Sequence, residues 1–252
     1  MSGPEQTRDF LDIAARTLLL PVLLGQAIMV RRTYIALPEP TGARAGTVGA
    51  GPPLRLLIIG DSSAAGVGVA TQDDALLGQL IARLKGHATV HYVLVAQTGA
   101  RTGDALGWLD DLAAARYDVV ITALGVNDVT KAVSLRRWLR QQTTLIDRIT
   151  TQFQTGRVII SGLPPIGQFP LLPQPLRWVL GRQAARFDRH LHRIAAERRD
   201  CVTLRFNMGL DETNMSADGY HPGPVVYARW AEEAARVILA DPDLLDGAGG
   251  AP

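Results

Sequence analysis

The feature that most constrains the fold is a set of short segments that are apolar at nearly every position. A strand exposed on one face alternates apolar and polar residues, whereas a strand covered on both faces is apolar throughout. Longer amphipathic stretches separate these segments, which favours a parallel sheet with helices on both sides. The expected strands span residues 54–59, 89–96, 118–124, 158–163 and, with a weaker pattern, 202–206.

The stretches between the strands show the spacing of apolar residues that is typical of amphipathic helices. Asp73 or Asp74 is a candidate N-cap for a helix that ends at Leu84. The other expected helices span residues 102–115, 134–153, 176–199 and 225–239. Together these elements predict a three-layer α/β/α sandwich around a five-stranded, flavodoxin-like parallel sheet.

Charge and cysteine content exclude several classes of function. The 252-residue chain has a net charge of +2 and no block of like charges that would indicate a nucleic-acid partner. Cys201 is the only cysteine, which excludes an internal disulfide and a cysteine-based metal site. We expect no metal and no other cofactor, because no cluster has the spacing of metal ligands. The remaining histidines outside the motifs below are expected at the surface: His87, His91, His190 and His192.

Residues 1–36 form an apolar helical segment whose core, residues 18–30, reads LLLPVLLGQAIMV. At ~1.5 Å per residue this core covers about 20 Å, which is short of a ~30 Å hydrocarbon layer. A secretory signal is not expected, because acidic residues precede the run and Arg31 and Arg32 follow it. We therefore expect a cytoplasmic protein whose first helix packs on the domain near its substrate site. The alternatives are self-association and contact with the inner face of the membrane.

The remaining boundaries follow from glycine and proline content. Residues 37–53 are rich in both and predict a connector without regular structure, and residues 54–240 form the globular domain. The glycine-rich end, residues 241–252, predicts a disordered tail.

Polar residues and glycines follow three of the expected strands at the point where each strand ends. Ser62 follows the first strand, Gly99 the second and Asn127 the third. In parallel α/β sheets, ligands bind beyond the carboxyl ends of the strands. We therefore expect these three residues to lie on one rim of the sheet.

Four short blocks in this order resemble those of the SGNH hydrolase (GDSL esterase/lipase) superfamily. They are Gly60-Asp61-Ser62, the glycine Gly99, Gly125-Val126-Asn127-Asp128 and Asp218-Gly219-Tyr220-His221-Pro222, and the resemblance covers residues 54–239. The first block reads GDSS where many members read GDSL. In the second block Gly103 is an alternative to Gly99, which we prefer because it directly follows the strand.

The same residues have a chemical reading of their own. A serine hydroxyl needs a nearby base to become a nucleophile, and His221 is the candidate base for Ser62. Asp218, three residues earlier, is placed to orient the imidazole. The backbone N–H groups of Ser62 and Gly99 and the side-chain amide of Asn127 are candidate donors of an oxyanion hole. The sequence thus predicts a serine esterase for a small-molecule ester, most simply one with a short acyl chain.

Other readings stay open at this level. The blocks taken singly are also ordinary turn and cap sequences. Gly66-Val67-Gly68 has two of the glycines of a nucleotide-binding loop but not the third. Alternatives to a short-chain ester are a lysophospholipid or an acetylated sugar at a membrane surface, and the non-enzyme alternative is a membrane-associated α/β scaffold. The apolar loop of residues 164–173 either lines an acyl pocket or packs as a stiff connector.

Overall fold

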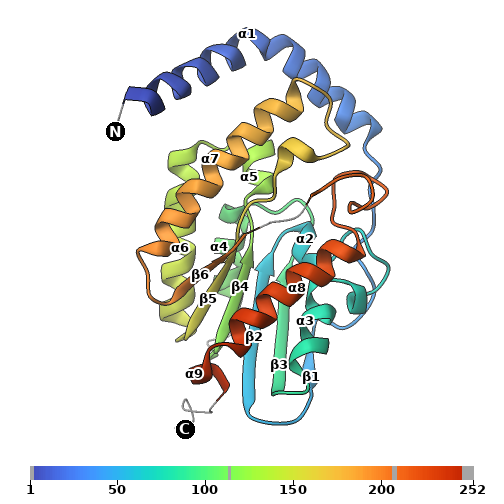
Figure 1. The fold of residues 1–252 in the computed structure, drawn as a ribbon. Helices are drawn as coiled ribbons and strands as arrows, with labels where there is room; N and C mark the ends of the chain where they lie inside the picture. Colours follow the sequence, from blue (N-terminus) through green and yellow to red (C-terminus); the bar gives the residue numbers. More distant parts are fainter. Residues whose placement is uncertain (1–2, 113–114, 206–208, 246–252) are drawn as a thin grey trace.

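The computed structural model describes residues 3–112, 115–205 and 209–245 and has a central six-stranded sheet (Figure 1). The strands lie in the order β1-β3-β2-β4-β5-β6, with β1 antiparallel to β3 and all other neighbours parallel. Their bounds are β1 Ala45–Val48, β2 Pro53–Gly60, β3 Thr89–Ala96, β4 Val119–Ala123, β5 Arg157–Ser161 and β6 Cys201–Leu204. The three-layer α/β/α prediction is confirmed, but the sheet has six strands rather than five.

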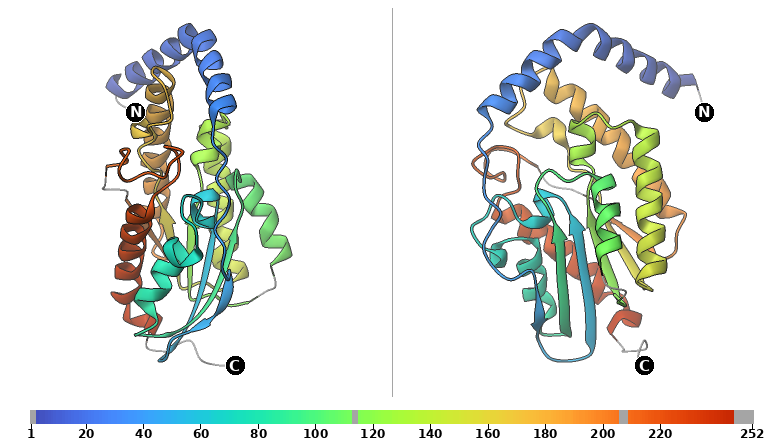
Figure 2. Two further views of the ribbon diagram at one scale, coloured as in Figure 1. Left: turned by 90° about the vertical axis from the view of Figure 1, so that its right-hand side faces the viewer. Right: turned by 180° about the vertical axis from the view of Figure 1, so that it is seen from behind.

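Helices cover both faces of the sheet (Figure 2). Alternate residues of β2 serve the two faces: Leu57 and Ile59 pack with α4 and α6, and Leu56 and Ile58 pack with α3 and α8. The helices are α1 Gly3–Thr33, α2 Ser62–Ala65, α3 Leu76–Leu84, α4 Thr102–Asp111, α5 Val126–Thr130, α6 Leu135–Gln152, α7 Leu176–Ala196, α8 Pro224–Leu239 and α9 Pro242–Leu245. Two short 3₁₀ helices, η1 Gln72–Asp74 and η2 Ile166–Gln168, complete the list for the described ranges.

The expected N-cap of α3 is wrong. Asp73 and Asp74 lie inside the 3₁₀ helix η1, and α3 begins only after Ala75, which provides no side-chain cap. The carboxylate of Asp74 instead accepts a hydrogen bond from the hydroxyl of Thr71. Neither aspartate therefore caps a helix.

The connector of residues 37–53 is not the irregular loop that its glycine content predicted, because it contains β1. A Cβ on Gly46 would lie 2.7 Å from the hydroxyl of Tyr92, so this glycine lets the edge strand lie against a bulky neighbour. Gly49, with φ +88°, and Gly51, with φ +127°, then form the turn into β2. The glycines that suggested a loop thus permit a close strand pair and its turn.

The tail is also more ordered at its start than expected. Residues 242–245 form α9, whose Leu244 is buried against the core. Asp241 forms an ion pair with Arg157 of β5. Residues 246–252 lie outside the described residues.

Helix α1 crosses one end of the molecule and contacts α7 (Figures 1 and 2). The helix contains Pro21, which cannot donate a backbone hydrogen bond, and it bends near its middle. Its contact stripe has helical spacing: Leu19, Leu23, Gln26 and Val30. Gln26 donates to the carbonyl of Gln174 and accepts from the N–H of Leu176, the first residue of α7. Among the described residues, no helix combines the length and hydropathy needed to cross a membrane.

Candidate active site

Ser62 lies where β2 ends and α2 begins, at the carboxyl rim of the sheet. A Cβ on Gly60 would lie 2.4 Å from the Cβ of Ala64 and 2.7 Å from the carbonyl oxygen of Ala123, so only glycine allows this tight exit from β2. Asp61 then caps α2, since its carboxylate accepts from the N–H of Ser63. The result is a buried serine held at the first position of a helix.

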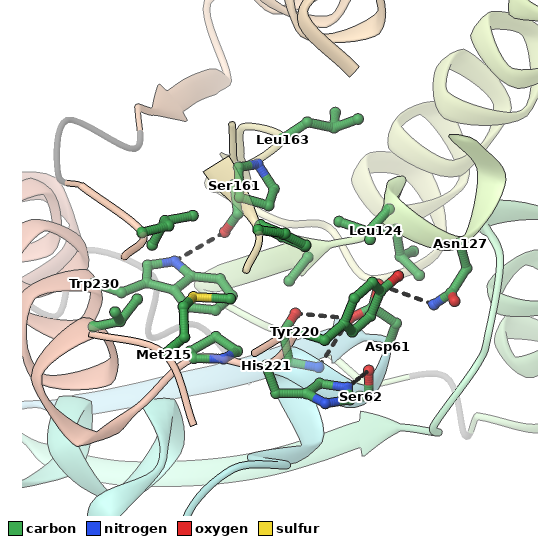
Figure 3. A pocket seen from close by; sticks show the side chains of 18 of the residues that line it. Asp61, Ser62, Leu124, Asn127, Ser161, Leu163, Met215, Tyr220, His221 and Trp230 are labelled. Atoms are coloured by element: carbon green, nitrogen blue, oxygen red, sulfur yellow. Dashed lines mark hydrogen bonds between the residues drawn. The ribbon is translucent and has the colours of Figure 1, made fainter. Parts of the chain in front are cut away.

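His221 and Asp218 lie in a tight loop, residues 215–222, near the C-terminal end of the domain, and His221 lies beside Ser62 in the pocket (Figure 3). The Nε2 atom of His221 is 2.8 Å from Oγ of Ser62, and its Nδ1 atom is 2.6 Å from Oδ2 of Asp218. The loop closes on itself, because the N–H of Ser216 donates to the carbonyl of His221 and Met215 pairs with Pro222. The three residues therefore form one hydrogen-bonded chain.

The carboxylate of Asp218 is strongly biased towards its ionised form. Burial alone would raise its pKa, but hydrogen bonds from the ring and backbone of His221 and from the N–H of Tyr220 lower it to about 2. Its Oδ1 atom also accepts from the hydroxyl of Ser216 at 2.8 Å. An ionised carboxylate beside Nδ1 favours the tautomer with its proton on that nitrogen, which leaves Nε2 as the acceptor for the Ser62 proton.

Asn127 follows β4 in the short helix α5 and lines the same pocket as Ser62. Its amide Nδ2 donates to Oδ2 of Asp61 over 3.3 Å. Asp61 is buried, and this burial raises its pKa, although the hydrogen bonds from Ser63 oppose the rise. The acid of the first block thus connects the nucleophile segment to the asparagine of the third, a link that sequence reasoning missed.

Gly99 lies in the turn after β3, with φ +80°, where Ala100 donates to the carbonyl of Gln97. The turn is held on two sides: Lys131 donates to the carbonyl of Gly99 at 2.6 Å, and Glu39 accepts from the N–H and hydroxyl of Thr98. Those bonds lower the pKa of Glu39 against the effect of its partial burial. Gly99 itself lies outside the lining of the Ser62 pocket.

The alternative glycine, Gly103, lies within α4. A Cβ there would lie 2.5 Å from Nε2 of Gln141 on α6, so Gly103 allows the two helices to pack closely. The register of β2 with β3 pairs Gly60 with Ala96, and Gln97 donates to the carbonyl of Gly60. The structure therefore places the Gly99 turn, rather than Gly103, next to the nucleophile segment.

A buried network that sequence reasoning also missed supports this rim. Oδ2 of Asp128 accepts from the N–H and hydroxyl of Thr102 at 3.0 and 2.9 Å, and Gln142 donates to the same hydroxyl. Burial raises the pKa of Asp128. In the sequence, only the position of Asp128 next to Asn127 pointed to this network, because its hydrogen-bond partners lie on α4 and α6.

A small pocket opens beside Ser62, with a volume of about 50 Å³ (Figure 3). Its walls are largely apolar, and Trp230 of α8 is fixed there by donating to the hydroxyl of Ser161. Pro164 and Phe169 belong to the lining, whereas Ile166 and Leu172 are buried in the core, so part of the loop of residues 164–173 faces the pocket and part packs against the domain. The other apolar lining residues include Leu124, Leu163, Leu210, Met215 and Val226.

Two observations concern residues away from the rim. His192 is largely buried and its Nδ1 atom is 2.7 Å from the hydroxyl of Thr203, so the expectation of a surface histidine is wrong there. Within the part of the chain that the structure describes, no group of three or more potential ligands could hold a metal ion.

The N-terminal segment also reaches this site. The ring of Tyr34, one residue after α1 ends, lies 6.4 Å from the ring of His221 and 6.3 Å from that of Tyr220. Tyr220 in turn packs edge-on against Phe169 in the pocket wall. Burial, followed by the charge of Asp218, raises the pKa of Tyr34.

Comparison with known proteins gives a family match and a set of similar folds. The model of the GDSL-like Lipase/Acylhydrolase family matches residues 58–229. Among curated proteins, a sequence search finds no significant match. The crystal structure of TesA has a TM-score of 0.60 and 19% identity, and the alignment covers 73% of this chain and 97% of TesA.

Two further solved structures are similar over comparable lengths. The psychrotrophic esterase EstA from Pseudoalteromonas sp. has a TM-score of 0.57 and 16% identity, with 74% of this chain and 99% of EstA covered. A catalytic mutant of Axe2, an acetylxylan esterase from Geobacillus stearothermophilus, has a TM-score of 0.53 and 17% identity, with 77% of this chain and 95% of Axe2 covered. At these identities the likeness concerns the fold.

Proposed function

Because this chain belongs to the GDSL-like lipase/acylhydrolase family and is a carboxylic ester hydrolase, we propose that it cleaves short-chain esters through a Ser62-His221-Asp218 triad. One observation carries the proposal. The hydrogen-bonded chain from Oγ of Ser62 through His221 to Asp218 ends beside a small apolar pocket. Ser62 and His221 come from the first and the last of the four sequence blocks, so only the fold brings them together.

The geometry supports a two-step acyl transfer. His221 takes the proton of Ser62 as Oγ attacks the ester carbonyl, and the imidazolium then gives a proton to the departing alcohol. Water attacks the acyl-enzyme in the second step, with His221 again as the base. Asp218, with its pKa of about 2, stays ionised throughout and stabilises the imidazolium.

Three donors are proposed for the oxyanion. Ser62 is the first residue of α2, and the first N–H groups of a helix have no acceptor within that helix. The amide of Asn127 has a second N–H besides the one that Asp61 accepts. The N–H of Gly99, in the turn beside Gly60, is the proposed third donor. Donors of this kind act on charge that develops only in the transition state.

Pocket size supports a short acyl chain. A volume of about 50 Å³ holds only a few water molecules, since each needs roughly 10–15 Å³ on this measure. Acetyl and similarly short groups fit within this volume, whereas a long acyl chain would extend beyond it. Axe2 is named as an acetylxylan esterase, which makes an acetylated sugar the second candidate substrate.

A series of chromogenic esters with increasing acyl length tests the substrate proposal. We expect kcat/KM to be highest for acetate to butyrate esters and to fall steeply beyond them. A maximum at long chains would contradict the short-chain assignment while leaving the triad untouched.

Covalent labelling tests the nucleophile separately. An organophosphate should modify the parent protein at Ser62, and Ser62→Ala should abolish the label although the adjacent Ser63 remains. Mass spectrometry of the peptide locates the modification. Labelling that persists in Ser62→Ala would remove Ser62 as the nucleophile, whereas a parent protein that is not labelled at all would favour the scaffold alternative.

A further inference from the structure

The side of α1 that faces away from the domain is apolar along three turns. Between Leu18 and Val30 the sequence contains no charged residue, and only Leu23 in this stretch is buried. Leu18 is 83% exposed, and Leu24 and Ile28 are each more than half exposed, at 56% and 54%. We call the exposed set the outer face: Leu18, Leu20, Val22, Leu24, Ile28 and Met29.

The breadth of the outer face decides what can cover it. A partner helix covers a single stripe with spacings of three and four residues, like the stripe of Leu19, Leu23, Gln26 and Val30 that the domain covers here. The outer-face residues are instead distributed around the whole part of the helix circumference that the domain leaves uncovered. A lipid surface can cover so broad an arc, and here the domain takes the place of the polar face that an interfacial helix normally has.

Charge and aromatic side chains beside the outer face fit the same partner. Arg31 and Arg32 are exposed in the last turn of α1. On α7, Trp178 is 40% exposed and its ring lies 5.6 Å from the guanidinium of Arg182. Gln26 bonds the start of this helix directly, so Trp178 lies next to the α1 contact. Arginine attracts anionic headgroups, and tryptophan favours the boundary between lipid and water.

The same end of α1 leads into the active site. Tyr34 contacts both His221 and Tyr220. In the proposed reaction His221 gives its proton to the leaving alcohol, so this alcohol must lie beside the imidazole. With the acyl group in the small pocket (Figure 3), the alcohol lies on the imidazole side of Ser62, and Tyr34 at the end of α1 flanks that imidazole.

From this arrangement we propose that the outer face of α1 docks on an anionic lipid surface and that the enzyme's ester has a short acyl group on a membrane-resident alcohol. The short acyl group enters the pocket, while the alcohol stays in the lipid layer that contacts the outer face of α1. The substrate half of this inference rests on the proposed function, whereas the docking half does not.

Flotation with vesicles tests the docking half. The full-length protein should bind vesicles that contain phosphatidylglycerol and bind pure phosphatidylcholine more weakly. Leu24→Glu with Ile28→Glu should abolish this binding, whereas Val225→Glu, an equally exposed apolar position on α8, should retain it. Ser62→Ala should bind like the parent, which separates docking from hydrolysis.

The arginines provide a charge-matched comparison. Arg31→Gln with Arg32→Gln should weaken binding to phosphatidylglycerol vesicles about 30-fold, since each arginine near an anionic surface contributes about fivefold. Arg136→Gln with Arg137→Gln changes the net charge equally, at two exposed positions on α6, and should leave binding within about twofold.

Hydrolysis tests the substrate half. For a long-chain alkyl acetate presented in phosphatidylglycerol vesicles, both α1 double variants should lose at least about tenfold in rate. Their rates on soluble 4-nitrophenyl acetate should match the parent. Equal losses on both substrates, or vesicle binding that persists in Leu24→Glu with Ile28→Glu, would overturn the proposal. A full-length dimer that only these two glutamates dissociate, without vesicle binding, would assign the outer face to a second copy of the chain.

Discussion

The loop of residues 215–222 and the N-terminal segment both reach His221, but they are held in the fold in different ways. Within the loop, the Asp218 carboxylate accepts from Ser216, from Tyr220 and twice from His221. Between Leu18 and Val30, by contrast, helix α1 contacts the domain through one stripe of side chains and leaves most of its other apolar side chains exposed. The loop is therefore held by hydrogen bonds within the protein. The free energy of α1 depends instead on whether water, lipid or another protein covers its exposed apolar side chains.

This difference predicts different kinds of mutational effect. In the proposed mechanism, changes in the triad and in the oxyanion donors should reduce kcat on every ester, because these groups act in the transition state. Changes in the N-terminal segment should alter chiefly where the enzyme acts. The predictions below probe that contrast in order of decreasing effect.

The largest effect is expected for Asp218→Asn. The amide cannot hold His221 in the tautomer that accepts the Ser62 proton, and a loss of this kind costs about 10³–10⁴ in kcat. Asp211 is the matched control, because its carboxylate accepts from Thr213 in a similar turn without contacting the triad. Asp211→Asn should retain kcat within about twofold. A rate for Asp218→Asn near that of the parent would reduce Asp218 to a turn residue.

The same substitution makes a prediction about stability. The folded-state pKa of Asp218, about 2, lies below its ordinary value of 3.8 in an unfolded chain, so its ionisation stabilises the fold above about pH 4. This contribution, about 2 kcal/mol, is lost as the pH falls towards 2. Urea unfolding at neutral and acid pH should therefore show parent and Asp218→Asn converging at low pH. A constant difference would contradict the linkage.

Asn127→Ala should cost about 10²–10³ in kcat, the usual loss for one oxyanion donor. KM should change little, because the oxyanion forms only after attack. Asn214→Ala serves as the control, because it removes an amide that donates to the carbonyl of Gly209 in the segment before the loop of residues 215–222. A loss confined to KM would assign Asn127 to substrate binding instead.

How much of this site is predictable from sequence depends on the range of the contact. The parallel strands could be located because burial on both faces leaves a local apolar signature, and β3 has the expected bounds, Thr89–Ala96. Ser62 and Asn127 could be placed on one rim because parallel strands end on the same side. The approach of His221 to Ser62 was inferred from chemistry and resemblance.

The missed features depend on distant partners. Strand β1 was mistaken for a loop because the reason for its glycine is not local: only glycine fits against Tyr92, a residue of another strand. The bond from Asn127 to Asp61 and the Asp128–Thr102–Gln142 network join segments far apart in the chain. Their side chains carry no local pattern that distinguishes them from ordinary caps and turns.

Asp128 shows how the rim could be weakened without touching the reacting atoms. Asp128→Ala leaves the buried N–H and hydroxyl of Thr102 without their acceptor and should cost about 2–3 kcal/mol of unfolding free energy. Asp128→Asn keeps an acceptor oxygen, and burial already disfavours the charge, so it should cost less than about 1 kcal/mol. Urea unfolding measures both. Equal losses would show that the charge, not the hydrogen bonds, is what matters.

The smallest effect is expected at Tyr34, where the two regions meet. Its ring packs against Tyr220 and His221, and an aromatic contact contributes about 0.5–1.5 kcal/mol, so Tyr34→Ala should lower kcat/KM on a soluble ester by up to about tenfold. Tyr34→Phe keeps the ring and should match the parent, which separates packing from any role of the hydroxyl. Initial rates on 4-nitrophenyl acetate measure both variants. If both variants lost activity equally, the hydroxyl would be the active group. If neither variant lost activity on the soluble ester, the N-terminal segment would have no effect on catalysis itself and would act only by locating the enzyme at its substrate.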